Sequence, residues 1–433
     1  MSKLEFKELV PELRFSQTEW QKKPFNKIYI LKTTNSLSRD KLNYDDGLVK
    51  NIHYGDIHTK FSTLFDITKE YVPFINTEIS LDKVKEESYC QEGDMIFADA
   101  SEDIDDVGKS IELINLNGEK LLSGLHTILA RQKGSYLVKG FGGYLFKSEV
   151  MRKQIQKESQ GAKVLGISAS RISNIEVIYP IDHDEQQKIA DCLSSMDDLI
   201  TTNTKKLELL KLHKKGLLQK LFTAEGKDIP ELRFDGFEGE WEEVELRKLG
   251  DLISGLTYSP DDVRASGLLV LRSSNVQNGK IVYEDNVFVE PNIKGANISE
   301  PDDILICVRN GSKALIGKNA LIPKNVPLST HGAFMTIFRS KYAQFTFQLF
   351  QTNAYQKQVD ADLGATINSI NGKQLLKYKF KIPRSNDEKE KIVKCLSSLD
   401  DLINAQTDKI EVLTEYKKGL MQQLFPKIKE SIA

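Results

Sequence analysis

The sequence predicts a tandem duplication in which each of two globular regions is followed by a long amphipathic helix. Residues 184–222 and 387–425 align without a gap at an offset of 203 and are identical at 23 of 39 positions. The string PELRF, followed shortly by a tryptophan, occurs ahead of each globular region, at Pro11 and again at Pro230. We therefore expect globular regions over 1–183 and 223–386, and helical spacers over 184–222 and 387–433.

The composition is that of a soluble globular protein, with 40% apolar and 28% charged residues. No run approaches the ~18 apolar residues of a membrane span, and MSKLEFKELV lacks the apolar core of a signal peptide, so we expect a cytoplasmic protein. Four cysteines without a CxxC pair suggest neither disulfides nor a metal site. A net charge of −2 means that any DNA binding needs local basic clusters or a partner.

The two repeated segments carry the apolar spacing of a coiled coil, alternating steps of four and three residues. The predicted seam consists of Ile189, Leu193, Met196, Ile200, Asn203, Leu207, Leu210, Leu217 and Leu221 in the first helix, and Ile392, Leu396, Leu399, Ile403, Gln406, Ile410, Leu413, Leu420 and Leu424 in the second. Lys214 and Lys417 fill a second gap in each stripe. With their neighbours Lys215 and Lys418, we expect them to be solvated or to contact a partner.

Helix signals suggest where these segments begin. Asp184 and Asp387 are predicted N-caps. The Asp pairs at 197–198 and 400–401 suit a helix first turn, so the Ser pair before each is predicted to divide its segment into a short helix and a longer one.

One such helix cannot bury its stripe alone, but two in the same chain can pair. From Asp197 to Phe222 a helix would be ~39 Å long. An antiparallel pair would place the globular regions at opposite ends about a pseudo-twofold axis, with Asn203 and Gln406 near one another. These two residues are either tolerated seam defects or a register device. An intermolecular coiled coil is the open alternative.

The pattern "EQ-KIA--LSS-DDLI----KKLE-L---KKGL-Q-LF", present twice after a region of ~180 residues, resembles the specificity subunit of type I restriction–modification enzymes. The resemblance covers the whole chain, with its strongest marks at Asp184–Phe222, Asp387–Phe425 and the PELRF motifs. It implies an α/β fold, with two target-recognition domains built on curved β-sheets and joined by an antiparallel coiled-coil helix pair.

The same resemblance implies a function in DNA recognition. Each recognition domain would read one half of a bipartite, asymmetric site in double-stranded DNA, and the helices would act as a ruler. The helices would also dock two methyltransferase subunits, which methylate adenine N6, together with the restriction subunits that cleave. S-adenosylmethionine, ATP and magnesium would bind those partners and not this chain. A ~39 Å spacer slightly exceeds one turn of B-DNA, ~34–36 Å, so two domains could engage successive groove faces.

Catalytic motifs do not emerge from the sequence. The nearest match to the Asn/Asp-Pro-Pro-aromatic loop of amino-methyltransferases, Val72-Pro73-Phe74, lacks the polar residue. The string from Gly311 to Asn319 is one residue too long for a phosphate loop and ends in Asn; it matches Val107–Lys109 as a strand–turn element. The six histidines show no metal spacing. We therefore expect a non-catalytic chain.

Polar and basic clusters near expected strand ends are the candidates for DNA contact, because Arg, Lys, Asn and Ser read base edges and phosphates. They are Arg39, Lys41, Tyr54, Lys60 and Lys163 in the first region, and Tyr258, Arg272, Ser273, Asn275, Arg309, Asn310, Lys313 and Thr366 in the second. Two other functions stay open: a coiled-coil scaffold that presents protein-binding domains, and an enzyme with an unrecognised site.

Overall fold

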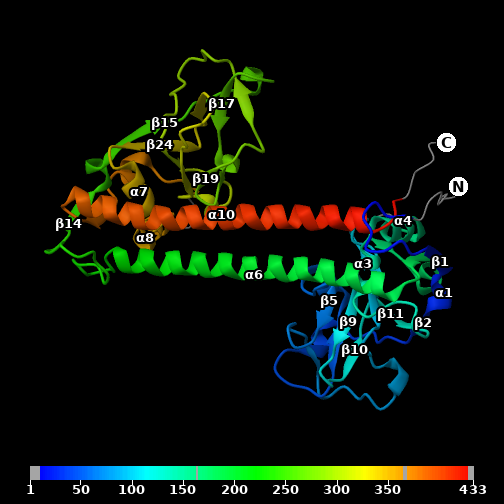
Figure 1. Ribbon diagram of the computed structural model, residues 1–433. Helices are drawn as coiled ribbons and strands as arrows, with labels where there is room; N and C mark the ends of the chain where they lie inside the picture. Colours follow the sequence, from blue (N-terminus) through cyan, green and yellow to red (C-terminus); the bar gives the residue numbers. More distant parts are fainter. Residues whose placement is uncertain (1–9, 162–163, 364–367, 428–433) are drawn as a thin grey trace. The chain divides into compact units, whose positions relative to one another are not determined.

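The computed structural model describes residues 10–161, 164–363 and 368–427 (Figure 1). It divides into two compact units: unit 1 comprises Met1–Thr204 and Lys409–Ala433, and unit 2 comprises Lys205–Asp408. The division crosses both long helices, α6 (His183–Leu221) and α10 (Asn386–Leu424). Each unit therefore contains the first part of one long helix and the last part of the other.

Unit 1 is a mixed α/β region. A five-stranded sheet has the order β2-β11-β7-β9-β5, and a four-stranded sheet the order β10-β4-β6-β3. The pairs β1-β13 and β12-β8 complete it. The strands are β1 (Trp20–Pro24), β2 (Tyr29–Lys32), β3 (Leu42–Asn43), β4 (Lys50–Ile52), β5 (Leu64–Asp66), β6 (Phe74–Ile75), β7 (Met95–Ala98), β8 (Ala100–Ser101), β9 (Ser110–Asn115), β10 (Leu121–Ser123), β11 (Thr127–Gln132), β12 (Leu165–Gly166) and β13 (Glu176–Pro180). The short helices are α1 (Phe25–Ile28), α2 (Tyr54–Thr59), α3 (Phe141–Leu145), α4 (Glu149–Glu158) and α5 (Ala169–Ile172).

Unit 2 repeats the strand order of this plan, while the first sheet of unit 1 has the additional edge strand β5. Its four-stranded sheets have the orders β15-β24-β21-β22 and β16-β20-β17-β23, beside the pairs β14-β25 and β18-β19. The strands are β14 (Glu242–Glu245), β15 (Gly250–Ser254), β16 (Val263–Arg264), β17 (Leu268–Leu271), β18 (Val276–Gln277), β19 (Lys280–Ile281), β20 (Val287–Val289), β21 (Ile304–Cys307), β22 (Asn319–Leu321), β23 (Ser329–His331), β24 (Met335–Ser340) and β25 (Lys379–Ile382). The helices are α7 (Ala343–Leu349), α8 (Asn353–Asp362) and α9 (Gly372–Leu375).

The strand register shows which residues of unit 1 correspond to which residues of unit 2. Ala98 pairs with Thr127 in unit 1, and Cys307 pairs with Met335 in unit 2. Both units also contain a parallel strand pair, β4–β10 or β17–β23, and unit 1 has a second one, β5–β9. The predicted α/β fold class with a tandem repeat is therefore confirmed.

The segments Val107–Lys109 and Ile316–Lys318 form matching turns that need glycine. Gly108 has φ +66° and Gly317 has φ +84°, where L side chains are strained. An added Cβ would lie 2.6 Å from Ile155 on α4 or 2.9 Å from Val359 on α8. These glycines therefore allow a helix to pack closely on the turn. Both segments follow the strand–turn interpretation made from the sequence.

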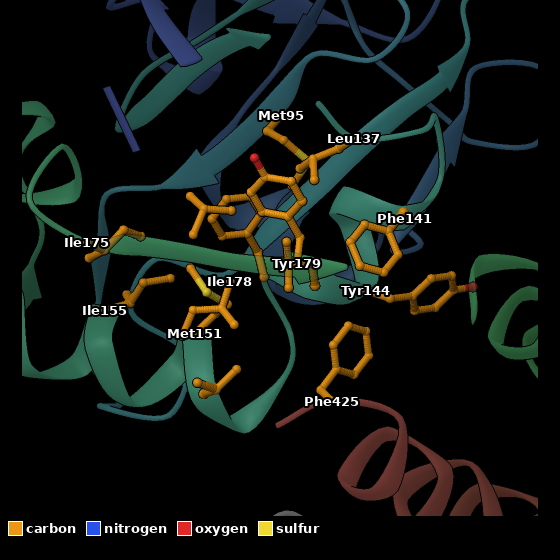
Figure 2. Packing of buried hydrophobic residues seen from close by; sticks show 14 of the residues in the cluster. Met95, Leu137, Phe141, Tyr144, Met151, Ile155, Ile175, Ile178, Tyr179 and Phe425 are labelled. Carbon is orange, nitrogen blue, oxygen red and sulfur yellow. The ribbon is translucent and has the colours of Figure 1, made fainter. Parts of the chain in front are cut away.

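Aromatic residues at the ends of the long helices belong to the hydrophobic cores of the globular regions. In unit 1, Phe425 packs against Trp20 and Phe141, with ring centroids 6.3 and 5.9 Å apart. Figure 2 shows Phe141 and Phe425 in this core. In unit 2, Phe222 packs against Trp241 and Phe345 at 6.1 and 5.6 Å. The end of one long helix is thus part of each hydrophobic core.

The PELRF motifs fasten the globular regions to the helix beginnings. Arg233 forms two bonds of 2.8 and 2.9 Å with the buried Glu388 carboxylate, to which Trp241 Nε1 also donates at 3.2 Å. In unit 1, Arg14 Nε lies 3.7 Å from Glu185 Oε1, while hydroxyls of Ser16 and Thr18 donate to the same carboxylate. The duplicated motif therefore has a duplicated structural role.

Each long helix is continuous over 39 residues, so the predicted division at the Ser pairs is wrong. Ser194 and Ser398 bond to carbonyls one turn earlier in their own helices, which lets serine persist inside a helix. The helices also begin earlier than predicted. Asp182 accepts the N–H of Asp184 at 3.0 Å and takes the N-cap role that the sequence assigned to Asp184. Asp387 likewise lies inside the first turn of α10.

The Asp pairs and seam lysines connect helix to helix within each unit. Asp197 accepts from Lys417 Nζ at 2.5 Å and from the Tyr144 hydroxyl at 2.8 Å. In unit 2, Asp400 accepts from Lys214 at 2.6 Å and from Gln348 at 3.2 Å. The first Asp of each pair therefore binds both the other long helix and the globular region of its unit. The expectation that Lys214 and Lys417 are solvated or contact a partner is wrong.

The predicted seam residues are all buried or half-buried. Within each unit the helix parts run antiparallel, because Leu193 and Met196 share a core with Leu424 and Leu420, and Leu218 and Leu221 share one with Leu396 and Ile392. Asn203 is buried and donates to Leu199 O at 2.7 Å, and Gln406 is also buried.

Among the residues that the structure describes, no helix is long and apolar enough to span a bilayer.

Candidate nucleic-acid interface

Four chain segments meet at one edge of unit 1, where several strands end. They are 53–58 after β4, 99–101 after β7, 124–126 between β10 and β11, and 165–167 at β12. Asp99 N donates to His126 O at 3.0 Å, and Ile167 N donates to Asp99 O at 2.8 Å. We call this set the strand-end surface of unit 1.

Matching segments meet in unit 2. They are 272–275 after β17, 308–313 after β21, 332–334 between β23 and β24, and 368–370. Val308 N donates to Phe334 O at 3.0 Å, and Ile370 N donates to Val308 O at 2.8 Å, which repeats the two bonds of unit 1. This set is the strand-end surface of unit 2. One backbone framework therefore presents two different sets of side chains.

Two of the predicted basic residues of unit 1 are arranged around a buried carboxylate. Asp56, fully buried on α2, accepts two hydrogen bonds from the Arg39 guanidinium at 2.8 and 2.9 Å. It also forms an ion pair with Lys60 Nζ at 3.0 Å. Bonds to Tyr44 and Asp56 raise the pKa of the Lys60 ammonium. Both cations are half-exposed, so Asp56 fixes two donors at the surface and leaves a net positive charge.

Tyr54, also predicted, begins α2 and lies among imidazoles. Its ring centroid is 4.7 Å from that of His53 and 5.3 Å from that of His126. Burial, reinforced by the Arg39 charge, lowers the pKa of His53. The surface here is therefore aromatic and can donate or accept hydrogen bonds, which suits contacts to bases or sugars.

The other predicted residues of unit 1 lie apart from this cluster or outside the description. Lys41 is exposed beside Asp40, 3.3 Å away, in the 3₁₀ turn that also carries Arg39. Lys163 lies outside the described residues.

In unit 2 the structure brings three predicted residues together. Asn310 Nδ2 donates to Ser273 Oγ at 3.1 Å, which joins the ends of β21 and β17. Arg309, next in the chain, is exposed and lies over the Phe334 ring with 5.7 Å to its centroid. Arg, Asn and Ser side chains, which can donate to base edges, therefore gather where the matching strands of unit 1 also end.

Other predictions for unit 2 need correction or refinement. Asn275 is fully buried; its side chain accepts from Arg272 N and donates to Val282 O, so it shapes its own turn and the prediction of a base contact is wrong. Arg272 is paired with Asp285 at 2.7 Å. Tyr258 is half-buried beside Gly332, and Lys313 is exposed. Thr366 lies outside the described residues.

Sequence reasoning missed exposed aromatic residues in both units. Tyr44 and Tyr71, outside the strand-end surface of unit 1, stack with centroids 4.4 Å apart, and Tyr71 is 70% exposed. Phe334 in the surface of unit 2 is 57% exposed, and His126 occupies its matching place in unit 1. Aromatic residues usually indicate a core, so only the strand register identifies Phe334 and His126. Within the described ranges no cluster of three or more His, Cys, Asp or Glu suits a metal ion.

A protein-family comparison decides what this framework belongs to. The model of the type I restriction modification DNA specificity domain matches residues 49–212 and again residues 238–415. The chain belongs to this family. It is therefore a type I restriction–modification specificity subunit, the non-catalytic component that recognises DNA sequence.

Relatives of this specificity subunit agree over most of its length. The MjaVIII specificity subunit of Methanocaldococcus jannaschii is 28% identical over 65% of this chain and 68% of its own. A putative MjaX specificity subunit from the same organism is 25% identical over 90% of this chain and 88% of its own.

Solved structures share the fold at low identity. The S subunit from M. genitalium superposes with a TM-score of 0.62 at 15% identity, covering 97% of this chain and all of that one. A chain from a study of complex assembly and conformational transition of the type I R-M system gives 0.56 at 14% identity, covering 98% and 100%.

Proposed function

We propose that this specificity subunit recognises a bipartite, asymmetric site in double-stranded DNA, with one half-site read by each unit. The observation that carries the proposal is the pair of strand-end surfaces. The matching bonds from Asp99 and Val308 give both the same backbone, while the exposed side chains differ. Base identity is read by side chains in the major groove, so like frameworks with unlike side chains read unlike half-sites.

The surfaces also explain how an acidic chain can bind DNA. The overall charge is −2, but Arg39 and Lys60 bind Asp56 on α2, beside the strand-end surface of unit 1, and Arg309 lies at the end of β21 in unit 2. Phosphate contacts contribute most of the affinity, so we expect weak binding by this chain alone and stronger binding when partner subunits add cations.

We further propose that the long helices dock two copies of a methyltransferase subunit and, with them, the restriction subunits. Exposed apolar side chains recur on the helices: Leu199, Val412 and Tyr416 in unit 1, and Leu402, Leu209 and Leu212 in unit 2. The Asp197–Lys417 and Asp400–Lys214 pairs place each set at one level of its helix pair. Apolar side chains that stay exposed in both copies suit a repeated protein contact.

In this assembly, S-adenosylmethionine, ATP and magnesium bind to the partners. The helices fix the gap between the half-sites, because each is uninterrupted over 39 residues.

The test uses the full chain co-expressed with its methyltransferase subunit. Native mass spectrometry should show two methyltransferase copies for each chain, and one copy after L209E with L212E. Polar T202E is the control. Long-read detection of methylated adenines, with and without this gene, should then return two half-sites and a fixed gap. Methylation without sequence selection would refute DNA recognition and favour a protein-binding scaffold.

A further inference from the structure

Arg309 is held at the end of β21 by backbone bonds from two sides. Its own N–H and that of Val308 donate to Phe334 O at 3.1 and 3.0 Å. On the other side, Ile370 N donates to Val308 O at 2.8 Å, and Arg309 forms a β-bridge with Ser369. The Arg309 backbone is therefore rigidly placed, and little ordering is needed when its side chain meets a ligand.

The charge of Arg309 is not neutralised. Its guanidinium lies 5.7 Å from the Phe334 ring centroid, and within residues 10–161, 164–363 and 368–427 no carboxylate pairs with it. Most arginines of unit 2 have such a partner, as in the pairs Arg272–Asp285, Arg264–Glu290, Arg339–Asp303, Arg247–Glu245 and Arg233–Glu388. A fixed, exposed and unpaired guanidinium is suited to an external acceptor.

Phe334 supplies an apolar neighbour. Its side chain is 57% exposed at the turn between β23 and β24, although exposure of a phenylalanine is unfavourable. Its ring supports the Arg309 guanidinium, as aromatic faces do for cations. The two side chains thus form one surface with a flat donor edge beside an apolar face.

We propose that Arg309 and Phe334 are the specificity-determining pair of unit 2, reading a guanine and the thymine next to it. Arginine bonds in two-pronged fashion to O6 and N7 of guanine, and apolar side chains contact the C5-methyl group of thymine in the major groove. Asn310, fixed by Ser273, lies next in the chain and supports the same edge. This inference rests on the proposed function, that unit 2 reads a half-site.

Unit 1 cannot make the same reading. Strand register places Ala100 where unit 2 has Arg309, and His126 where it has Phe334. His126 Nδ1 lies 3.1 Å from Asp99 Oδ1, so this imidazole already has a carboxylate partner. The guanine–thymine reading therefore belongs to one half-site only.

The experiment compares the full chain, co-purified with its methyltransferase subunit, as wild type, R309A, F334A and the control R384A. Arg384 is also exposed without a carboxylate partner among the described residues, but follows β25. Methylation of a randomised duplex library followed by sequencing gives each target. We expect R309A to lose discrimination for guanine at one position by about 10- to 100-fold. The other half-site and the R384A target should not change.

Phe334 has a separate readout. Replacing the adjacent thymine with uracil removes only its methyl group, and should weaken wild-type binding by about 3-fold or more while leaving F334A binding unchanged. An intact second half-site in each variant shows that the protein is folded.

Three results would overturn the inference. They are an R309A target identical to that of wild type, a wild-type site with no guanine–thymine step in the half-site that R309A affects, and an equal uracil effect in F334A and wild type. The proposed function fails differently, because the wild-type complex would then methylate without selecting a sequence.

Discussion

Units 1 and 2 share a backbone and differ in the side chains it presents. At matching strand ends, unit 1 carries Ala100 and His126, whereas unit 2 carries Arg309 and Phe334. The bonds that fix the two edges are the same, from Asp99 N to His126 O and from Val308 N to Phe334 O. Under the proposed function, the framework sets where a side chain meets DNA, and the residue placed there sets which base is read.

The two units also differ in the contacts that join each globular region to the beginning of a long helix. Both use a PELRF arginine and a buried helix glutamate, but only Arg233 makes two close bonds to its carboxylate. Arg14 Nε stays 3.7 Å from Glu185 Oε1, while the hydroxyls of Ser16 and Thr18 both donate to the other carboxylate oxygen, Oε2. The same motif therefore stabilises the two units to different extents.

The largest expected effect comes from removing these arginines. Arg233→Ala should destabilise unit 2 by about 3–5 kcal/mol, because it leaves the Glu388 carboxylate buried without its partner. Arg14→Ala should cost unit 1 only about 1–2 kcal/mol, since the two hydroxyls remain. Hydrogen exchange in increasing urea, followed peptide by peptide, separates the units.

Arg247→Ala is the matched control, because Arg247 is half-exposed and pairs with Glu245 at the surface. It should change stability by less than about 1 kcal/mol. Equal losses from Arg14→Ala and Arg233→Ala would show that the two fastenings are equivalent.

The second effect is opposite pH dependence in the two units. Burial raises the pKa of Glu112 in unit 1 to about 7. The folded state therefore favours the protonated form, and stability falls as the pH rises from about 4.5 to about 7, by roughly 3 kcal/mol. In unit 2, Leu321 occupies the matching position.

Unit 2 instead contains His331, whose pKa burial lowers from its usual 6.5. Its neutral form is favoured in the fold, so its contribution is complete above pH 6.5 and is lost as the pH falls through the lowered pKa. Thermal melting of Glu112→Gln and His331→Gln between pH 4.5 and 8 tests both slopes. A wild-type slope that persists in Glu112→Gln would assign the pH dependence to another group.

The smallest effect distinguishes the two helix-packing turns. Gly108→Ala and Gly317→Ala should each cost about 1–3 kcal/mol from the left-handed backbone and the contact with the helix. The loss should be greater for Gly108, because the added Cβ would lie 2.6 Å from Ile155, against 2.9 Å from Val359.

Gly118→Ala provides the control, since Gly118 has φ +73° but nothing within 4 Å of an added Cβ. It should lose only about 1 kcal/mol, from the backbone term. Chemical unfolding gives the three values, and a Gly118 loss equal to that of Gly108 would remove the packing argument.

The long helices could be predicted from sequence because a repeat and an apolar period are local signals. Their continuity could not, because Asp197 resembles a helix start until Lys417 and Tyr144 are seen to hold it. The site was predicted by residue type, which identified Arg309 and Asn310 at the strand-end surface. Residue type could not show that the Asn275 side-chain amide forms hydrogen bonds within its own turn, or that Phe334 is exposed.

Unit 1 begins earlier in the chain than unit 2, but it is completed later during synthesis, because its core needs the end of α10. Leu13 N donates to Gln423 O at 2.9 Å, and the unit 1 core needs Phe425, whereas the matching bond in unit 2 joins Leu232 to Lys220. Every residue of unit 2 therefore leaves the ribosome before the last turns of α10. Trp20 and Phe141 therefore lack their contact with Phe425 until Phe425 has been synthesised, and during that interval this part of unit 1 is exposed to chaperones and proteases.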